Sequence, residues 1–215
     1  MEVSGWLERL MPDVHSADWR DGCWVGHVKM RSAEHHPPLH WLGRALDSVD
    51  AAGAIDVIGE QLSLAHEPEA CAGWSEADQR VQDALTEACA IAWAAGRLGR
   101  PEPVQATDGR LLIHVPSVDA CVAPRRLWPV RTMEDLLGQV REHIDGAAAA
   151  LPDAAGRISY VDINLEINAF GRMLGHDGQM TEPLRESLKF VSQERGVGWV
   201  LTRPFEWGVP LEEWY

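Results

Sequence analysis

The sequence predicts an α+β fold, in which one domain holds a mixed β-sheet packed against three or more helices. Two long segments, 75–98 and 132–151, repeat apolar residues at helical spacing. From Val161 onward, apolar and polar residues alternate strictly, which is typical of a strand with one buried face. The second half of the chain orders its elements strand–helix–strand–helix–strand, which suits a parallel or mixed sheet. A three-layer α/β arrangement is the alternative.

The length favours one domain over residues 1–215. A chain of 215 residues with 46% hydrophobic and 24% charged residues buries most of its apolar surface when it folds. The clearest linker is the segment 100–109, which begins Arg100-Pro101-Glu102-Pro103 and holds a turn at Asp108-Gly109. If the chain subdivides, we expect the boundary there.

The first part of the chain gives weaker signals. Pro37-Pro38 marks a break between elements. The apolar patterns predict helices over 3–10 and 39–49 and strands over 23–31 and 54–64, with a helix as the alternative for 54–64.

The helix over 75–98 has signals at both ends. Ser75 and Asp78 have the spacing of a capping box at its start. Gly96 and Gly99 mark its end. Cys89 falls on its apolar stripe, where we expect a buried, reduced thiol.

Two short strands, 111–115 and 118–122, should form a hairpin before the second long helix. Thr132 is the expected N-cap of that helix because Asp135 follows three residues later. Pro152 ends it.

The remaining elements complete the strand–helix alternation. We expect a strand over 158–168, a helix over 181–194 that ends at Gly196, and a strand over 197–202. The tail, 203–215, mixes Trp, Phe, Pro and acids, and should pack irregularly.

The strand over 158–168 carries the best candidate site. Its polar face presents a row of oxygen-rich side chains, Asp162, Asn164, Glu166 and Asn168. A glycine-rich loop over 169–180 follows and holds His176 and Asp177. The two carboxylates lie about 13 Å apart along a strand, too far for a tight acid–base dyad. One of them could share a divalent ion with the loop, and the alternative is a solvated sheet face.

The net charge bounds the choice of partner. At −14 the chain lacks the basic face that nucleic-acid binders use, so nucleic acid is not expected as a partner. The acidity indicates either general solubility or a surface that complements a basic protein. Of the ten tryptophans, Trp207 and Trp214 are candidate partner contacts, because Trp is enriched at binding hot spots. The alternative is that they hold the tail against its own domain.

Familiar chemical signatures are missing from the sequence. There is no P-loop, dinucleotide fingerprint, nucleophile elbow, HExxH or CxxC motif, so no cofactor is evident beyond a divalent metal. No apolar run is long enough to cross a bilayer, and the acidic first residues do not resemble a secretory signal. A cytoplasmic protein with no membrane partner is expected.

Three functions follow from these observations. The charge, the tryptophans and the missing motifs favour a non-enzymatic interaction protein that binds and masks a basic protein partner, as an immunity or antitoxin-like inhibitor does. The first alternative is a small-molecule enzyme, with or without a metal, whose site is the polar face of 162–168 and the loop 169–180. The second alternative is a structural subunit of a larger assembly. Of enzyme and non-enzyme, the sequence favours the non-enzyme.

Overall fold

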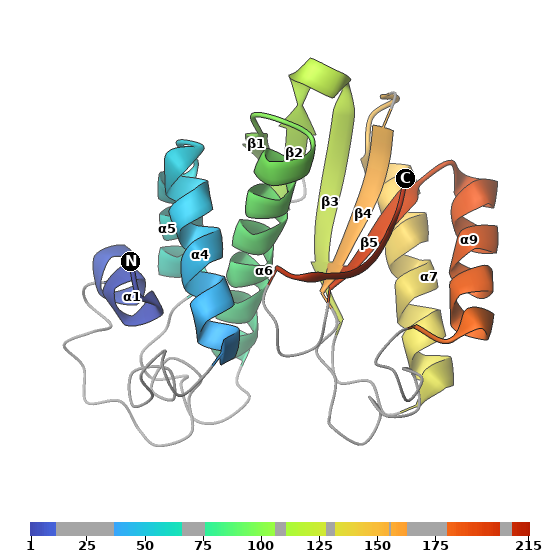
Figure 1. Ribbon diagram of the computed structural model, residues 1–215, viewed down its shortest axis with the longest axis horizontal. Helices are drawn as coiled ribbons and strands as arrows, with labels where there is room; N and C mark the ends of the chain where they lie inside the picture. Colours follow the sequence, from blue (N-terminus) through green and yellow to red (C-terminus); the bar gives the residue numbers. More distant parts are fainter. Residues whose placement is uncertain are drawn as a thin grey trace. The chain divides into compact units, whose positions relative to one another are not determined.

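The computed structural model confirms the α+β class: six α-helices accompany a six-stranded mixed sheet in the described part of the chain (Figure 1). The described residues are 1–11, 37–65, 76–105, 111–127, 132–154, 156–162, 180–202 and 208–215. None of the helices in these ranges combines the length and the apolar character needed to cross a membrane.

The chain divides into two compact units. One holds Met1–Ala95 with Glu206–Gly208, and the other holds Gly96–Phe205 with Val209–Tyr215.

The sheet belongs to the second unit, and its strands follow one another across it in sequence order. The first three strands and the last two pair antiparallel, whereas β3, β4 and β5 are parallel neighbours. The strands are β1 (Glu102–Gln105), β2 (Leu111–Val115), β3 (Ala120–Arg126), β4 (Gly156–Asp162), β5 (Gly198–Thr202) and β6 (Pro210–Trp214). A 3-10 turn, η3 (Pro116–Val118), joins β2 to β3.

Two helices, α7 (Met133–Ala150) and α9 (Glu182–Arg195), connect the parallel strands and lie side by side on one face of the sheet (Figure 1). Parallel strands need such crossover helices because their ends lie far apart. The core beneath these helices is apolar. Its members include Leu136, Val140 and Ile144 of α7, Leu184 and Leu188 of α9, and Val161, Trp199 and Leu201 of the sheet.

Local sequence fixes the ends of both helices. The Thr132 hydroxyl accepts a hydrogen bond from the Asp135 N–H, and the Asp135 carboxylate accepts one from the Thr132 N–H, both at 3.1 Å. This capping box satisfies two amides at the start of α7. Helix α9 ends at Gly196, whose left-handed conformation (φ 61°) suits a residue without a side chain.

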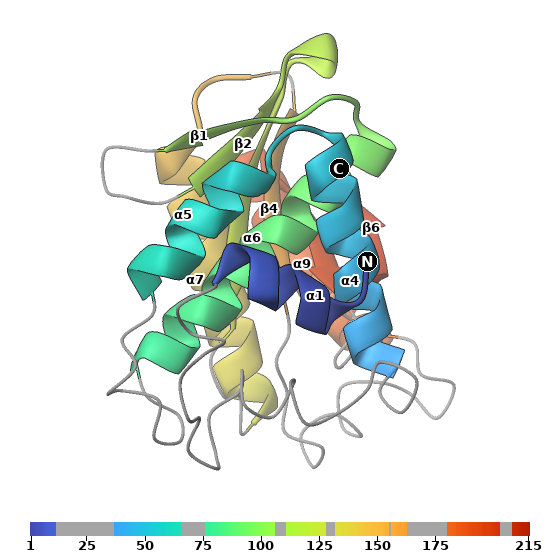
Figure 2. The same cartoon turned by 90° about the vertical axis from the view of Figure 1, so that its left-hand side faces the viewer.

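The first unit holds four helices: α1 (Val3–Leu10), α4 (Pro37–Ala51), α5 (Ile55–Ala65) and most of α6 (Glu76–Arg97). Helix α1 packs against both α4 and α5 (Figure 2). Asp47 of α4 accepts a hydrogen bond from Trp6 Nε1 at 2.9 Å and contacts the Met1 amine at 2.8 Å. Burial alone would raise the pKa of Asp47, but these two donors outweigh it and lower the pKa.

The expected helices over 3–10, 39–49, 75–98, 132–151 and 181–194 are confirmed within a few residues, as are the hairpin strands and the strand over 197–202. Cys89 is a buried thiol rather than part of a disulfide, as its place on the stripe of α6 predicted. Residue 75 and the strand expected over 23–31 lie outside the described residues. Residue 78 is in α6, but its side chain is outside the described ones, so the capping pair stays a prediction.

Three expectations need correction. The segment 54–64 is the helix α5, not a strand, because Ile55, Ile58 and Leu62 recur at helical spacing and are buried on one side. The expected linker contains the edge strand β1, in which Pro103 is tolerated as edge strands allow. The tail is not wholly irregular, since it adds β6 to the other edge of the sheet.

Candidate functional site

Three polar residues end the three parallel strands of the second unit. Arg126 is the last residue of β3, Asp162 of β4 and Thr202 of β5. Arg126 pairs in register with Asp162, and the Thr202 hydroxyl donates a hydrogen bond of 2.5 Å to Asp162 Oδ1. We call these three residues the strand-end row. Carboxyl ends of parallel strands are the usual ligand-binding edge of open sheets.

The strand-end row is buried: Arg126 is 5% exposed, Asp162 9% and Thr202 0%. Withdrawing a carboxylate and a guanidinium group from water is costly unless opposite charge and hydrogen bonds compensate. The Leu127 N–H also donates to the Asp162 carbonyl oxygen at 2.9 Å, which ties β3 to β4 beside the row. The Thr202 hydrogen bond orients the Asp162 carboxylate, and the Leu127 bond fixes the backbone beside it.

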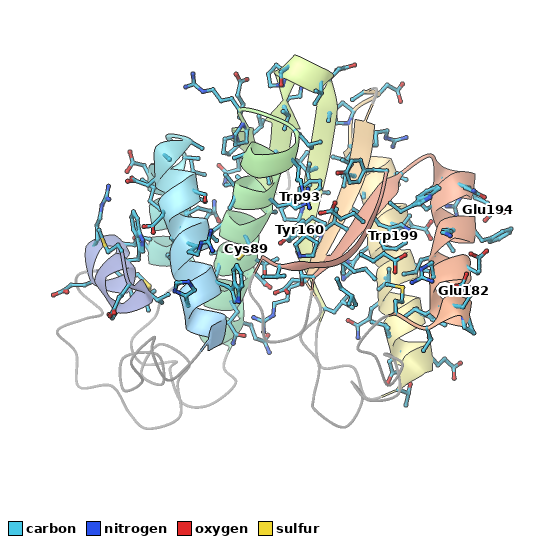
Figure 3. All side chains as sticks on the ribbon, viewed as in Figure 1. Cys89, Trp93, Tyr160, Glu182, Glu194 and Trp199 are labelled. Atoms are coloured by element: carbon cyan, nitrogen blue, oxygen red, sulfur yellow. The ribbon has the colours of Figure 1, made fainter. Side chains whose placement is uncertain are left out.

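The strand-end row lies on the sheet face opposite the α7–α9 layer. Val161 and Leu201, one residue before Asp162 and Thr202, belong to the core beneath those helices. Successive residues of a strand point to opposite faces, and Figure 3 shows Tyr160 and Trp199 on opposite sides of the sheet accordingly. Both faces of β4 are buried here, because Ser159, Tyr160, Val161 and Asp162 are all buried. At Asp162, therefore, the polar face expected from the sequence is not a solvated one.

The predicted site is only partly covered by the described residues. Of its members on the strand and loop, Asp162 alone is described, and the following lie outside the described ranges: Asn164, Glu166, Asn168, His176 and Asp177. The candidate partner residue Trp207 also lies outside them. Trp214 is described and half-buried: it pairs in register with Trp199 across β5 and β6 and packs against the core.

Sequence reasoning missed Arg126 and Thr202 as companions of Asp162. Their signal was their position, because each is the polar residue that closes an apolar strand. Once β3, β4 and β5 are recognised as parallel, their last residues must lie at one edge of the sheet. The order in which the strands pair is long-range information, and it cannot be read from the local sequence of each strand.

A second surface is the outer side of the α7–α9 layer, where every basic side chain of the two helices contacts another residue of the chain. Arg141 donates to the Ser187 hydroxyl at 3.0 Å, and Arg195 pairs with Asp145 at 2.5 Å. Three further ion pairs link Lys189 to Glu186 at 3.2 Å and Arg185 to both Glu182 and Glu212.

The carboxylates of this layer remain open to solvent. Glu134, Glu142, Glu182, Glu186 and Glu194 are all exposed. Figure 3 places Glu182 and Glu194 along α9. On α9 three basic side chains, Arg185, Lys189 and Arg195, match the three glutamates, so the acidic excess of the layer lies on α7, where four exposed carboxylates face one arginine.

The first unit has an open groove of about 590 Å³ between α1 and α5. Arg9, Leu10, Asp56, Gly59, Glu60 and Ser63 line it. Arg9 is directed to the Asp50 carboxylate at 3.3 Å and lies 4.9 Å from the Trp6 ring centre. Asp56 and Glu60 are one helical turn apart, so their charges repel weakly.

The described side chains offer little to covalent or metal chemistry. Among the described residues, no three His, Cys, Asp or Glu side chains are grouped closely enough to hold a metal ion. Burial, together with the nearby Asp119 carboxylate, raises the pKa of the Cys121 thiol. A thiol with a raised pKa stays protonated and is a weak nucleophile.

Comparison of the chain with protein-family models, with curated proteins and with solved structures gave no match. The function of the strand-end row and of the α7–α9 layer is therefore inferred from their own residues alone.

Proposed function

We propose that this chain is a non-enzymatic acidic protein that binds and masks a basic protein partner, in the manner of an immunity or antitoxin-like inhibitor. The observation that carries the proposal is the net charge of −14, together with an excess of exposed carboxylates on α7. Glu134, Asp135, Glu142 and Asp145 of that helix are exposed, and Arg141 is its one arginine or lysine.

Such a surface has two effects on association. Its carboxylates attract a cationic partner over a distance of about 8–10 Å at physiological salt, which raises the association rate. It also disfavours acidic partners by like-charge repulsion. The net charge of −14 acts in the same direction over the whole chain.

The proposal includes a reducing compartment such as the cytoplasm. Cys89 and Cys121 are buried thiols that take part in no disulfide, and such thiols suit a compartment in which disulfides do not persist.

The test is native mass spectrometry of the protein purified gently from its own source. We expect a second polypeptide with a basic isoelectric point, and we expect the complex to dissociate as salt rises from about 0.05 to 0.5 M, where screening shortens electrostatic range. A complex that survives high salt unchanged, or a second polypeptide that is acidic, contradicts the proposal.

The second candidate function is a small-molecule site at the strand-end row. A buried Arg126–Asp162–Thr202 row at the carboxyl ends of parallel strands favours it, because these groups together can bind a polar molecule that carries both donors and acceptors. In this case the mass spectrum should show the chain plus a small molecule or a divalent ion. Replacing Asp162 by Asn should remove that added mass. An Asp162→Asn variant that keeps the added mass excludes Asp162 as a ligand.

A further inference from the structure

We infer that the C-terminal tail, Gly208–Tyr215, is a strap that couples α6 to the strand-end row. Gly208, at one end of the strap, packs against Cys89 of α6, and two residues later Pro210 pairs in register with Thr202 of the row. Every residue involved belongs to this chain, so the coupling holds or fails independently of the proposed function.

The contact with α6 is made by the backbone of Gly208. A Cβ built at this position would lie 3.3 Å from Cys89 Cβ and 3.4 Å from Cys89 Sγ, closer than most Cβ atoms approach a neighbour. Cys89 is 2% exposed in the interior of α6, so it has little room to move away. Gly208 also has a φ of 73°, a left-handed conformation that glycine adopts without strain. A side chain at position 208 would therefore push the strap and the helix apart.

The link from Gly208 to Pro210 is stiff. The proline ring fixes its own φ at about −65° and restricts the preceding residue, Val209, to an extended conformation. Val209 is also β-branched, which limits its side-chain rotamers. One residue with little conformational freedom thus separates the contact on α6 from the pair with Thr202, and it cannot absorb a displacement of Gly208.

The rest of the strap is fixed on the sheet. A register shift sets Pro210, rather than Leu211, opposite Thr202. Such bulges bend an edge strand and redirect its side chains. Beyond the bulge, Glu212 pairs with Arg185 of α9 at 2.5 Å. The strap is held at both ends, so a shift at Gly208 is passed on to Pro210.

Thr202 is the residue through which the strap reaches the strand-end row. Its hydroxyl donates the 2.5 Å hydrogen bond to Asp162 Oδ1, and its side chain is fully buried. Movement of Pro210 displaces the end of β5 and, with it, this hydrogen bond. The strap is therefore a positioning device for the Asp162 carboxylate.

The test compares two glycines that share a backbone conformation. Gly208→Asn adds a side chain against Cys89, and because asparagine tolerates the left-handed conformation, the added volume is the main change. Gly53→Asn is the matched control, since Gly53 has a φ of 76° and a Cβ there meets nothing within 4 Å. We expect Gly208→Asn to quicken hydrogen exchange of the Leu201 and Thr202 amides at least about fivefold, as overpacking implies. Gly53→Asn should change it less than about twofold.

NMR and a second substitution locate the effect. The Thr202 methyl signal and the Asp162 carboxyl carbon signal should shift in Gly208→Asn, whereas exchange of the α7 amides, in the same unit as the row, should stay unchanged. Pro210→Gly loosens the link. In that background Gly208→Asn should no longer affect Thr202, because two changes that act through one link are not additive. Circular dichroism establishes that each variant is folded.

Equal exchange of the Leu201 and Thr202 amides in Gly208→Asn and Gly53→Asn overturns the inference. So does an effect of Gly208→Asn that persists in the Pro210→Gly background, because the coupling then does not pass through the link. If Gly208→Asn does not fold, Cys89→Ala takes its place, since it removes the Sγ atom from the contact. Unchanged Thr202 and Asp162 signals in Cys89→Ala then overturn the inference.

Discussion

The Thr202 hydroxyl donates a 2.5 Å hydrogen bond to the Asp162 carboxylate, and both side chains are buried at the ends of neighbouring parallel strands. The bond joins β4 to β5 by side chains just beyond their last described register pair, Val161 and Leu201. Because a hydrogen bond to a charged group is stronger than one between neutral groups, this pair fixes the strand ends and orients the carboxylate together.

Replacing Thr202 by Val should lower the free energy of unfolding of the second unit by about 1.5–3 kcal/mol, the usual value of a hydrogen bond to a charged group. Valine keeps the shape of threonine and removes only the hydroxyl donor. The measurement is native-state hydrogen exchange of the β4 and β5 amides, which isolates this unit from the rest of the chain. Thr202→Ser, which keeps the hydroxyl, is the control and should lose markedly less. Equal exchange in Thr202→Val and the unmodified chain would show that the bond contributes nothing.

The place of Asp162 shows how far the sequence could predict the site. The strand expected over 158–168 is confirmed as β4 as far as Asp162, and the alternating residues 163–168 lie outside the described ranges. The pattern alone cannot tell whether the face that carries Asp162 meets water. Burial of a sheet face depends on which elements pack on it, and α7 and α9 pack on the opposite face, that of Val161 and Leu201. Burial of Asp162 therefore depends on long-range packing, which local periodicity does not contain.

The helices were more predictable than the short strands for a related reason. Caps and a repeated stripe specify a helix such as α7 within its own sequence, as the Thr132 and Asp135 pair does. By contrast, β1 and β6 have four and five residues. Both carry proline, and each exists because a neighbouring strand supplies its hydrogen bonds. In 54–64, the β-branched Val57 and Ile58 suggested a strand, but the spacing of the buried residues of α5 decided for a helix.

Thr132→Ala should destabilise α7 by about 1 kcal/mol, the usual loss for an N-cap residue. Alanine removes the oxygen that accepts from the Asp135 N–H at 3.1 Å. Hydrogen exchange of amides in the first turn of α7 should quicken, whereas exchange in its last turn should change little. Thr132→Ser retains the cap and is the control. If first-turn exchange is the same in Thr132→Ala and Thr132→Ser, the cap does not hold the helix start.

Two glycine-to-alanine replacements should have opposite effects. At Gly198 a Cβ would lie 2.5 Å from Tyr215 Cβ and 2.8 Å from the Trp214 carbonyl oxygen, so β6 must move away from β5. At Gly138, on the exposed side of α7, a Cβ meets nothing within 4 Å.

We expect Gly198→Ala to lose protection of the β6 amides in hydrogen exchange, because its clash is with backbone rather than with a flexible side chain. Gly138→Ala should stabilise α7 by about 0.5–1 kcal/mol, since alanine is the better helix former. If both variants shift the free energy of unfolding in the same direction, Gly198 does not lie in close contact with Trp214 and Tyr215.

Acid should release α1 from α4 through Asp47. The pKa of Asp47 in the folded chain is lowered from its ordinary value of 3.8. A carboxyl group with a lowered folded pKa stabilises the fold fully above its unfolded pKa, and that stabilisation is lost as the pH falls through the folded pKa. The contact with Trp6 Nε1 should therefore be intact at pH 5 and weaken below pH about 4. The indole N–H signal of Trp6 in an NMR titration reports it directly. In Asp47→Asn, whose side chain does not titrate, this signal should not follow the same acid transition. A Trp6 signal with the same acid midpoint in both proteins would show that another group, and not Asp47, controls the contact.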